Sequence, residues 1–357
     1  MQSYNYLKDC WYVAGLSREF ETGALTGQQV AGRPIVIWRT KKGSVVAFDD
    51  RCCHKRFPLS KSKLLDNGLL ECAYHGLCYN DVGQCVKIPA QPDDKIPEQA
   101  RLRSIPIIEQ DGLVWIWTGN PERSSDFQPP RTPEISDPKW NSMDSGPMHI
   151  PANYLLVIEN LLDITHFYPL HDGNIGEYAN SSLPIELEEG DSGGYRYVKT
   201  SRRASDYKQP PYFADWFHYD VVDREHTHCM LSPGLTRVEL RVAPVGKLGT
   251  GIDRGYVLYH SHTPVDDNRN VWRWCVSTPA EHMSRGDPAK PAVERIAEMF
   301  PDVVKQDQWA LELQQKMIEC PDEGYSELFL QSDKAVQRAR QVIGQMRRQE
   351  MQYAEKQ

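Results

Sequence analysis

The sequence lacks the features of a membrane, secreted or nucleic-acid-binding protein. No segment approaches the roughly 20 apolar residues that a membrane-spanning helix needs. The first residues have neither the charged region nor the apolar region of a signal peptide. No block of basic residues stands out in a chain whose net charge is −8. These absences predict a cytoplasmic protein with no membrane partner and no nucleic-acid partner.

A disulfide framework is also missing. The nine cysteines are odd in number and scattered over 357 residues. Disulfide-rich scaffolds are short secreted chains with closely spaced, even-numbered cysteines, so we expect reduced thiols here, some bound to metal and others buried. The chain is long enough for two domains or one large one.

The first 120 residues predict an all-β domain. Short runs rich in β-branched and aromatic residues are separated by turn signals, and no convincing helical stretch interrupts them. The clearest of these runs are residues 33–40, 43–50, 76–80, 85–89 and 112–119. We therefore expect a small antiparallel sandwich or barrel.

The composition changes after residue 120. Residues 121–138 are rich in proline, serine and charge, which predicts a linker. Residues 139–357 then mix helical and strand patterns, and we expect an α+β domain with an antiparallel sheet flanked by helices. The expected helices are residues 154–170, 289–317 and 332–349, and the expected strands are residues 195–201, 236–245, 255–262 and 270–277.

Two short cysteine–histidine motifs stand out in the predicted β domain. Cys52-x-His54 and Cys72-x-x-His75 are separated by seventeen residues. Two thiolates and two imidazoles fit a Rieske [2Fe–2S] cluster, in which the thiolates hold one iron and the imidazoles the other. A structural zinc site with the same ligand types is the alternative, although zinc motifs usually open with two cysteines two to four residues apart. Four buried residues without metal are the third interpretation.

At these residues the chain resembles the Rieske domain of the ring-hydroxylating, or Rieske non-haem iron, oxygenases. The resemblance continues through residues 11–16, 73–89 and 111–119. The related respiratory proteins carry an extra cysteine in each loop, where this chain has Phe57 and Tyr74, so their disulfide cannot form. Two residues depart from the family.

The departures lie within and directly after the first motif. Cys53 stands where the family usually has proline, and Lys55 stands where it usually has arginine, with Arg56 following. We expect Cys53 to be a buried bystander beside the cluster.

A second motif lies in the predicted α+β domain. It reads Asn160-x-x-Asp163-x-x-His166-x4-His171. Asp163 and His166 are three residues apart and would share a helix face, whereas His171 would lie about 140° round from His166 on an ideal helix. Both histidines can reach one metal only if the helix loosens or ends near Pro169. Two histidines with a distant carboxylate form the facial triad of non-haem Fe(II) oxygenases; two incidental histidines are the alternative.

The family resemblance includes this second motif. It implies that His166 and His171 bind a mononuclear Fe(II). It also implies that Asp163 connects His75 of a neighbouring subunit to His166 of its own subunit, and we count Asn160 and Asp163 as catalytic residues. The family's third ligand is an aspartate that begins a helix reading Asp-x4-Glu-x-Gln. Asp307 matches that pattern, and Asp302 is the rival.

Two His-x-His pairs occupy predicted strands of the same domain. These are residues 226–228 and 260–262, and strand alternation places both histidines of a pair on one face. They form a second metal site, line the substrate pocket, or are polar residues of the sheet surface or of the core. Trp272, Trp274 and Cys275 are expected in the core.

The resemblance implies a function. The chain would be a terminal oxygenase component that receives electrons from NAD(P)H through a reductase or ferredoxin and uses dioxygen to hydroxylate or O-/N-demethylate a small aromatic substrate. Its length resembles that of the shorter family members, such as vanillate O-demethylase and dicamba monooxygenase. Because the electron path within one subunit is expected to be too long, a homotrimer is implied. A ring cis-dihydroxylating dioxygenase, an electron carrier with a decayed second site and a zinc-stabilised binding module are the alternatives.

Overall fold

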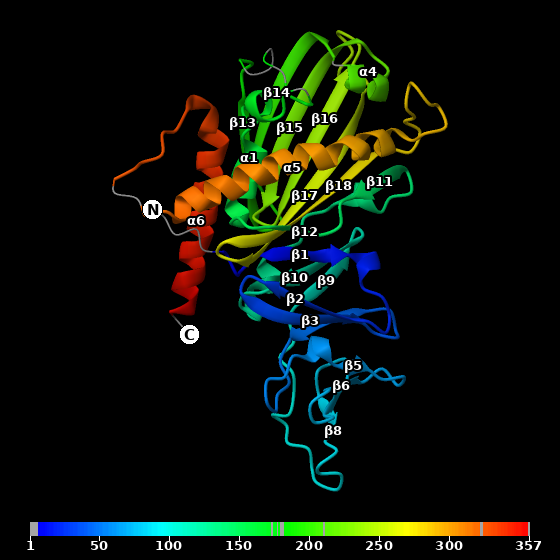
Figure 1. The fold of residues 1–357 in the computed structure, drawn as a ribbon, viewed down its shortest axis with the longest axis vertical. Coiled ribbons are helices and arrows are strands. Elements are labelled where there is room, and N and C mark those ends of the chain that lie inside the picture. Colours follow the sequence, from blue (N-terminus) through cyan, green and yellow to red (C-terminus); the bar gives the residue numbers. More distant parts are fainter. Residues whose placement is uncertain are drawn as a thin grey trace. The chain divides into compact units, whose positions relative to one another are not determined.

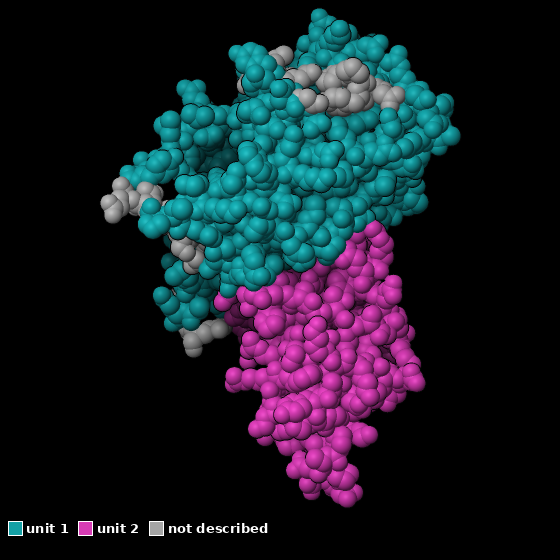
Figure 2. Space-filling model, in the orientation of Figure 1, with its two compact units in different colours: residues 1–7, 130–357 teal, residues 8–129 magenta. Residues whose placement is uncertain are grey.

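The chain divides into two compact units. The computed structural model describes residues 6–355 except 173, 177, 179–181, 210 and 322–323. The N-terminal unit is Lys8–Pro129, and the C-terminal unit combines Met1–Leu7 with Pro130–Gln357 (Figure 1 and Figure 2). The predicted linker carries local structure, since η3 (Pro121–Asp126) belongs to the first unit and η4 (Pro133–Ile135) to the second. None of the described helices is both long and apolar enough to cross a membrane.

The N-terminal unit consists of three antiparallel sheets. Their strand orders are β1-β10-β9, β2-β3-β4 and β5-β6-β7-β8. The strands are β1 (Trp11–Leu16), β2 (Leu25–Val30), β3 (Arg33–Arg39), β4 (Val45–Asp49), β5 (Lys63–Leu64), β6 (Leu70–Glu71), β7 (Cys78–Tyr79), β8 (Cys85–Lys87), β9 (Ile107–Gln110) and β10 (Leu113–Trp117). The helical segments in this unit are the 3₁₀ turns η1 (Ser17–Glu19), η2 (Leu59–Lys61) and η3. The predicted all-β fold is confirmed.

The C-terminal unit is built on one eight-stranded antiparallel sheet. Its path is β11-β18-β17-β16-β15-β14-β13, and β12 also pairs with β18. The strands are β11 (Trp140–Asp144), β12 (Met148–Ile150), β13 (Glu186–Ser192), β14 (Tyr195–Lys208), β15 (Val221–Ser232), β16 (Leu235–Ala243), β17 (Arg254–Asp266) and β18 (Arg269–Pro279). The strand alternation turns one face of this sheet into the core surface.

Helices cover that face of the sheet. Figure 1 shows α5 (Ala292–Glu319) crossing it, with α1 (Tyr154–Leu162) alongside. The remaining helices are α2 (Phe167–Leu170), α4 (Pro211–Phe217), η5 (Gln331–Asp333) and α6 (Lys334–Ala354). The core beneath them contains Trp272 and Trp274, as predicted from sequence. Each fully buried large apolar side chain of this kind contributes about 1.5–3 kcal/mol.

The helix predicted over residues 154–170 is broken, and the break lies at Asp163 instead of near Pro169. Asp163 has an extended backbone (φ −90°, ψ 98°) and ends α1, and the short α2 begins at Phe167. Asp163 and His166 therefore do not share a face of one helix. Pro169 is tolerated because it occupies the first turn of α2, where its missing N–H is not needed.

Candidate metal centres

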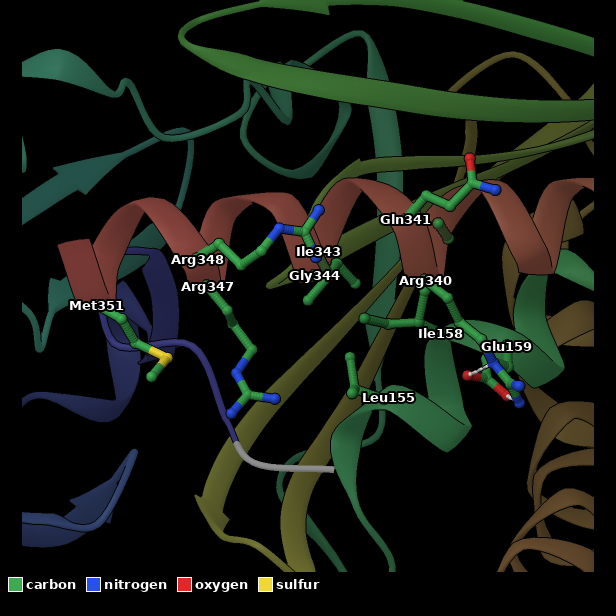
Figure 3. Close-up of a pocket in the computed structure, with 11 residues that line it drawn as sticks. Leu155, Ile158, Glu159, Arg340, Gln341, Ile343, Gly344, Arg347, Arg348 and Met351 are labelled. Carbon is green, nitrogen blue, oxygen red and sulfur yellow. Dashed lines mark hydrogen bonds and ion pairs between the residues drawn. The ribbon is translucent and has the colours of Figure 1, made fainter. Parts of the chain in front are cut away.

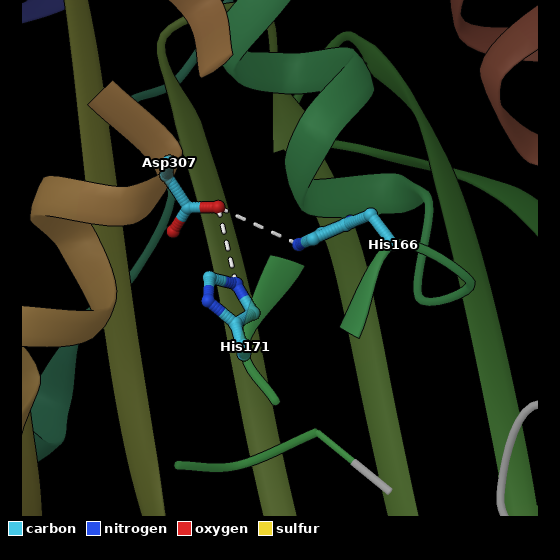
Figure 4. A group of neighbouring side chains, drawn as sticks. All are labelled: His166, His171 and Asp307. Carbon is cyan, nitrogen blue, oxygen red and sulfur yellow. Dashed lines mark ion pairs between the residues drawn. The ribbon is translucent and has the colours of Figure 1, made fainter. Parts of the chain in front are cut away.

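The structure brings together two histidines and one aspartate from distant parts of the C-terminal unit. His171 Nε2 lies 3.2 Å from Asp307 Oδ1, and His166 Nε2 lies 3.5 Å from the same oxygen. The ligand atoms of the three residues lie within 4.8 Å of one another (Figure 4). The two histidines flank α2, and the aspartate comes from the middle of α5. Two imidazoles and one carboxylate at this spacing fit the facial triad of a mononuclear ferrous site.

The outer nitrogen of each imidazole is already used. His171 Nδ1 lies 2.9 Å from Gln306 Oε1, and His166 Nδ1 contacts the main-chain carbonyl oxygen of Asp163. Both partners are oxygen acceptors, so each Nδ1 carries the proton and donates it. Each Nε2 faces Asp307, and with Nδ1 as the donor it can give its lone pair to a metal ion. This is the tautomer that a metal ligand needs.

Asp307 is held in place from α1. Asn160 Nδ2 donates to Asp307 Oδ1 over 3.0 Å, and Asp307 is only 5% exposed. The rival ligand, Asp302, is exposed at the surface of the same helix and pairs with Lys305. The structure therefore groups Asp307, and not Asp302, with the histidines. Asp307 lies in the middle of α5, whereas the family pattern predicted an aspartate at the start of a helix.

Burial and charge act in opposite directions on the two imidazoles. Burial lowers the pKa of His166 below its usual value, although the charges of Asp307 and Asp163 oppose this. Burial also acts to lower the pKa of His171, but the hydrogen bond and charge of Asp307 outweigh it, and that pKa is raised. The Asp307 carboxylate therefore stabilises the charged form of His171.

The Asp163 carboxylate contacts a different residue from the one expected. Its Oδ1 accepts hydrogen bonds from Thr165 N (2.8 Å) and Thr165 Oγ1 (2.5 Å). Within its own subunit, the carbonyl oxygen of Asp163 contacts His166, whereas the carboxylate was predicted to do so. The Asx turn with Thr165 that follows the end of α1 explains the difference, because an aspartate that ends a helix readily bonds the backbone two residues on.

The two cysteine–histidine loops of the N-terminal unit have matching backbone hydrogen bonds. Cys52 N donates to Phe57 O (2.9 Å) and Cys72 N donates to Leu77 O (2.8 Å). Arg56 N donates to Cys52 O and Gly76 N donates to Cys72 O, over 3.0 and 2.9 Å. These last two donors both adopt positive φ, 56° and 73°. The matched turns present one cysteine and one histidine from each loop, as a shared cluster requires.

The cysteines and histidines of these loops differ in exposure. Cys52 and Cys72 are buried, whereas His54 and His75 are exposed, with their rings 4.5 Å apart. Over the described residues, the only set of three or more that converges closely enough for one ion is the His166–His171–Asp307 group. The four loop residues are thus not grouped around a single ion, whereas a two-iron cluster takes two thiolates on one iron and two imidazoles on the other.

Residues next to the loops bear on two of the sequence predictions. The rings of Phe57 and Tyr74 lie 5.7 Å apart where the respiratory proteins would have a disulfide. Cys53 is exposed, so the prediction that it is buried was wrong. Its sulfur lies 3.2 Å from Tyr79 Oη, which also lies 3.1 Å from Cys52 Sγ.

The four histidines of the two His-x-His pairs are buried on strands β15 and β17. His226 Nε2 lies 3.2 Å from His228 Nε2, and both rings lie within 6 Å of the Phe167 ring. His260 accepts from Trp272, and His262 pairs with Thr236. They do not form a second metal group among the described residues. One of them, His226, does line a cavity.

Two hollows of the C-terminal unit differ in their relation to the metal group. A groove between α1 and α6 is lined by residues such as Arg347 and Met351, and Glu159 forms a two-fold ion pair with Arg340 there (Figure 3). None of the three grouped residues lines it. A narrower cavity is lined by Phe167, whose ring lies 5.0 Å from that of His166, although none of the three grouped residues lines this cavity either.

Sequence reasoning missed several residues of this region. Gln306, Arg202 and Arg224 were not singled out. Gln306 directly precedes the candidate ligand Asp307, and this position could have identified it as a residue of the site. The two arginines occupy inward positions of strands β14 and β15, and the alternation that flagged His226 and His228 also includes Arg224.

Comparisons with known proteins agree with both sites. Residues 10–106 match the Rieske [2Fe-2S] domain, and residues 150–349 match the vanillate O-demethylase oxygenase C-terminal domain. This chain belongs to the Rieske non-haem iron oxygenases. Its fold matches the crystal structure of dicamba monooxygenase bound to 3,6-dichlorosalicylic acid, with a TM-score of 0.86 and 25% identity over 98% of this chain and 99% of that chain.

Sequence relatives give the same family. This Rieske oxygenase is 31% identical to the toluene-4-sulfonate monooxygenase system iron–sulfur subunit of Comamonas testosteroni, over 70% of each chain. It is 31% identical to the vanillate O-demethylase oxygenase subunit of a Pseudomonas strain, over 74% of this chain and 75% of the relative.

The family membership confirms several sequence predictions. This Rieske oxygenase is an enzyme, the terminal oxygenase component of a system with a separate reductase. Its cofactors are a Rieske [2Fe–2S] cluster and a mononuclear non-haem iron. The electron-carrier alternative predicted a missing iron ligand, and the structure instead brings three candidate ligands together.

Proposed function

We propose that this Rieske oxygenase is a monooxygenase that removes an O- or N-methyl group from a small aromatic or heteroaromatic substrate. The observation that carries the proposal is the convergence of His166, His171 and Asp307 next to a cavity lined by Phe167. Two relatives support demethylation by their names, the dicamba O-demethylase oxygenase component and the vanillate O-demethylase oxygenase subunit.

The proposal assigns the metal ligands by residue. Cys52, Cys72, His54 and His75 hold the Rieske cluster, and His166, His171 and Asp307 hold the mononuclear iron. The ferrous ion supplies dioxygen activation beside the substrate, because a facial triad leaves coordination positions open. Asn160 and Gln306 orient Asp307 and His171, while Phe167 supplies an apolar wall that excludes water from one side of the site.

Asp163 is proposed to connect two subunits. Its carbonyl oxygen already contacts His166, and its carboxylate is proposed to accept a hydrogen bond from His75 of a neighbouring subunit. The exposed position of His75 supports this, because an imidazole at a surface can reach another chain. Such a ring of contacts closes in a homotrimer.

Ring cis-dihydroxylation is the second candidate, since the same ligand set serves both reactions. The test is to reconstitute the anaerobically purified protein with a ferredoxin-type reductase and NADH and to supply methoxy-, N-methyl- and carboxy-aromatics. Oxygen uptake and formaldehyde are recorded together. Equal amounts of both support demethylation. Oxygen uptake with a ring diol and no formaldehyde would replace the proposal with dihydroxylation.

A further inference from the structure

A narrow cavity borders the candidate iron site. Its walls come from the segment around α2 and from strands β14 and β15, and they include Phe167, Arg202, Arg224 and His226. The Phe167 ring lies 5.0 Å from the His166 ring and 5.6 Å from the His171 ring. None of the three grouped residues lines the cavity, so Phe167 is the lining residue that connects it to both candidate iron ligands.

Strand pairing places two arginines on the same wall of the cavity. In the β14–β15 ladder, Arg202 pairs with His226 and Ala204 pairs with Arg224. Because side chains alternate along a strand, Arg202, Arg224 and His226 project from one face of the sheet. Arg224 is 6% exposed, and its guanidinium lies 5.0 Å from the Phe213 ring.

Arg202 has donors that none of the described residues satisfies. It is 8% exposed, and its Nη1 makes a 3.4 Å hydrogen bond to the Ile164 carbonyl oxygen. Its Nε and Nη2 are buried without a hydrogen-bond partner. Buried donors are nearly always paired, and a buried charge without a partner is strongly unfavourable. Nε and Nη2 form one of the edges of a guanidinium that can bind two oxygens of an anion in parallel.

Nearby charges do not neutralise the Nε and Nη2 edge of Arg202. Burial lowers the pKa of Arg202. The charge of Asp163 acts to raise this pKa, and the charge of Arg224 acts to lower it further. The Asp163 Oδ1 atom is already bonded to Thr165. His226 is uncharged, because burial holds its pKa well below the usual value. Arginine keeps its charge in proteins, so the cavity holds two buried cations.

We propose that the cavity binds an anionic group of the substrate, a carboxylate or sulfonate on an aromatic ring, through the Nε and Nη2 edge of Arg202. Arg224 adds a second positive charge. The cavity has a volume of about 30 Å³, room for the anionic group alone, so the ring lies in a wider hollow that shares Tyr168 with the cavity, with its reacting carbon toward the three grouped residues. The inference rests on the proposed function for the direction of the reacting carbon, but the anion site stands on Arg202 itself.

A wider hollow supplies a route to this site. It shares Tyr168, Leu183 and Ala204 with the cavity, and it also includes Asp206 and Lys208. A flat aromatic anion could enter between these residues with its charged end first. The cavity then selects substrates by charge as well as by shape.

The test measures binding to the purified holoprotein by titration calorimetry. The probes are 4-methoxybenzoate with 4-methoxybenzamide, and benzenesulfonate with benzenesulfonamide, so each pair differs in charge and hardly in size. We expect at least one anion to bind about tenfold or more tightly than its amide, as charged hydrogen bonds predict. Arg202→Gln should remove that difference, and Arg202→Lys should retain only part of it because the two-donor edge is lost.

A matched control is available on the same strand. Arg203 projects from the opposite face and is 65% exposed at its side chain, so Arg203→Gln should keep the wild-type preference. Without ligand, Arg202→Gln should melt at or above the wild-type temperature, since it removes an uncompensated buried charge. A lower melting temperature together with an unchanged anion preference would show that Arg202 has a structural role and would overturn the inference.

The outcomes separate this inference from the proposed reaction. An anion preference that depends on Arg202, without product from any substrate, would support the site and reject the demethylase proposal. Turnover of neutral substrates with a KM that Arg202→Gln does not change, and no preference for either anion, would support the reaction and overturn the anion site.

Discussion

Asn160 on α1 donates a hydrogen bond to the same Asp307 oxygen that faces both histidines. The Asn160 Nδ2 to Asp307 Oδ1 distance is 3.0 Å, and that oxygen lies 3.2 Å from His171 Nε2. One amide therefore fixes the rotation of the carboxylate before any metal binds. Partners of this kind tune metal affinity as well as geometry.

Replacing Asn160 should weaken iron binding without removing a ligand. We expect Asn160→Ala to lower the affinity for mononuclear iron by about 10–100-fold, because the carboxylate loses the donor that orients it. Iron content after dialysis against graded chelator measures this. The exposed Asn268 serves as the control, and a loss of iron as large in Asn268→Ala would contradict a specific role for Asn160.

Asp307 and Asp302 provide a paired test on one helix. Asp307→Asn should lose about one third of the total iron, the mononuclear site, and keep the spectrum of the cluster. Asp302→Asn should retain all the iron, because that carboxylate is exposed and pairs with Lys305 at the surface. Metal analysis and electron paramagnetic resonance distinguish the two sites. Loss of the cluster in Asp307→Asn would reject the assignment of two separate centres.

Gln306 is expected to control the orientation of His171. Gln306→Leu removes the acceptor for His171 Nδ1–H, so the imidazole can rotate or change tautomer. Iron affinity should fall by about 10–100-fold. Gln308 lies on the same helix and bonds Glu312, so Gln308→Leu is the control. Equal iron affinity in the Gln306 variant and wild type would remove Gln306 from the site.

Asp163→Asn should stop turnover while leaving the metal content unchanged. Both metals should remain, because His166 contacts the carbonyl oxygen of residue 163 and not its carboxylate. Electron delivery between subunits should fail, since the proposed acceptor for His75 of the neighbour is lost. Single-turnover reduction of the cluster followed by stopped-flow reoxidation measures this. Normal turnover in Asp163→Asn would rule out the bridging role.

The buried His262 should make the free energy of unfolding depend on pH. Burial lowers the pKa of His262 to about 3, whereas an unfolded histidine titrates near 6.5. Between these values the unfolded state binds more protons, so stability rises with pH in this window and is lost as the pH falls below about 6.5.

The size of this effect can be measured by urea unfolding between pH 7.5 and 5.0. One such histidine adds at most about 1.4 kcal/mol per pH unit to the slope of stability against pH. His262→Gln should reduce that slope. His149 is exposed, and His149→Gln should retain the wild-type slope. An unchanged slope in His262→Gln would mean that His262 is already protonated in the fold or stays neutral when unfolded.

The local sequence determined the chemistry of both centres. The cysteine–histidine spacing predicted loops that each supply one thiolate and one imidazole, and the matched turns at Cys52 and Cys72 agree with that. The spacing of His166 and His171 likewise required a break in the helix. These features are local, because a few neighbouring residues decide which ligands one turn can present.

Tertiary structure alone decided which distant residues complete each site. The choice between Asp302 and Asp307 depended on burial, since both lie on α5 and only one faces α1. Gln306, Arg202 and Arg224 acquired roles because α5 and strands β14 and β15 bring them beside α2. Spacing in sequence cannot predict such contacts, because they depend on how the sheet and helices pack.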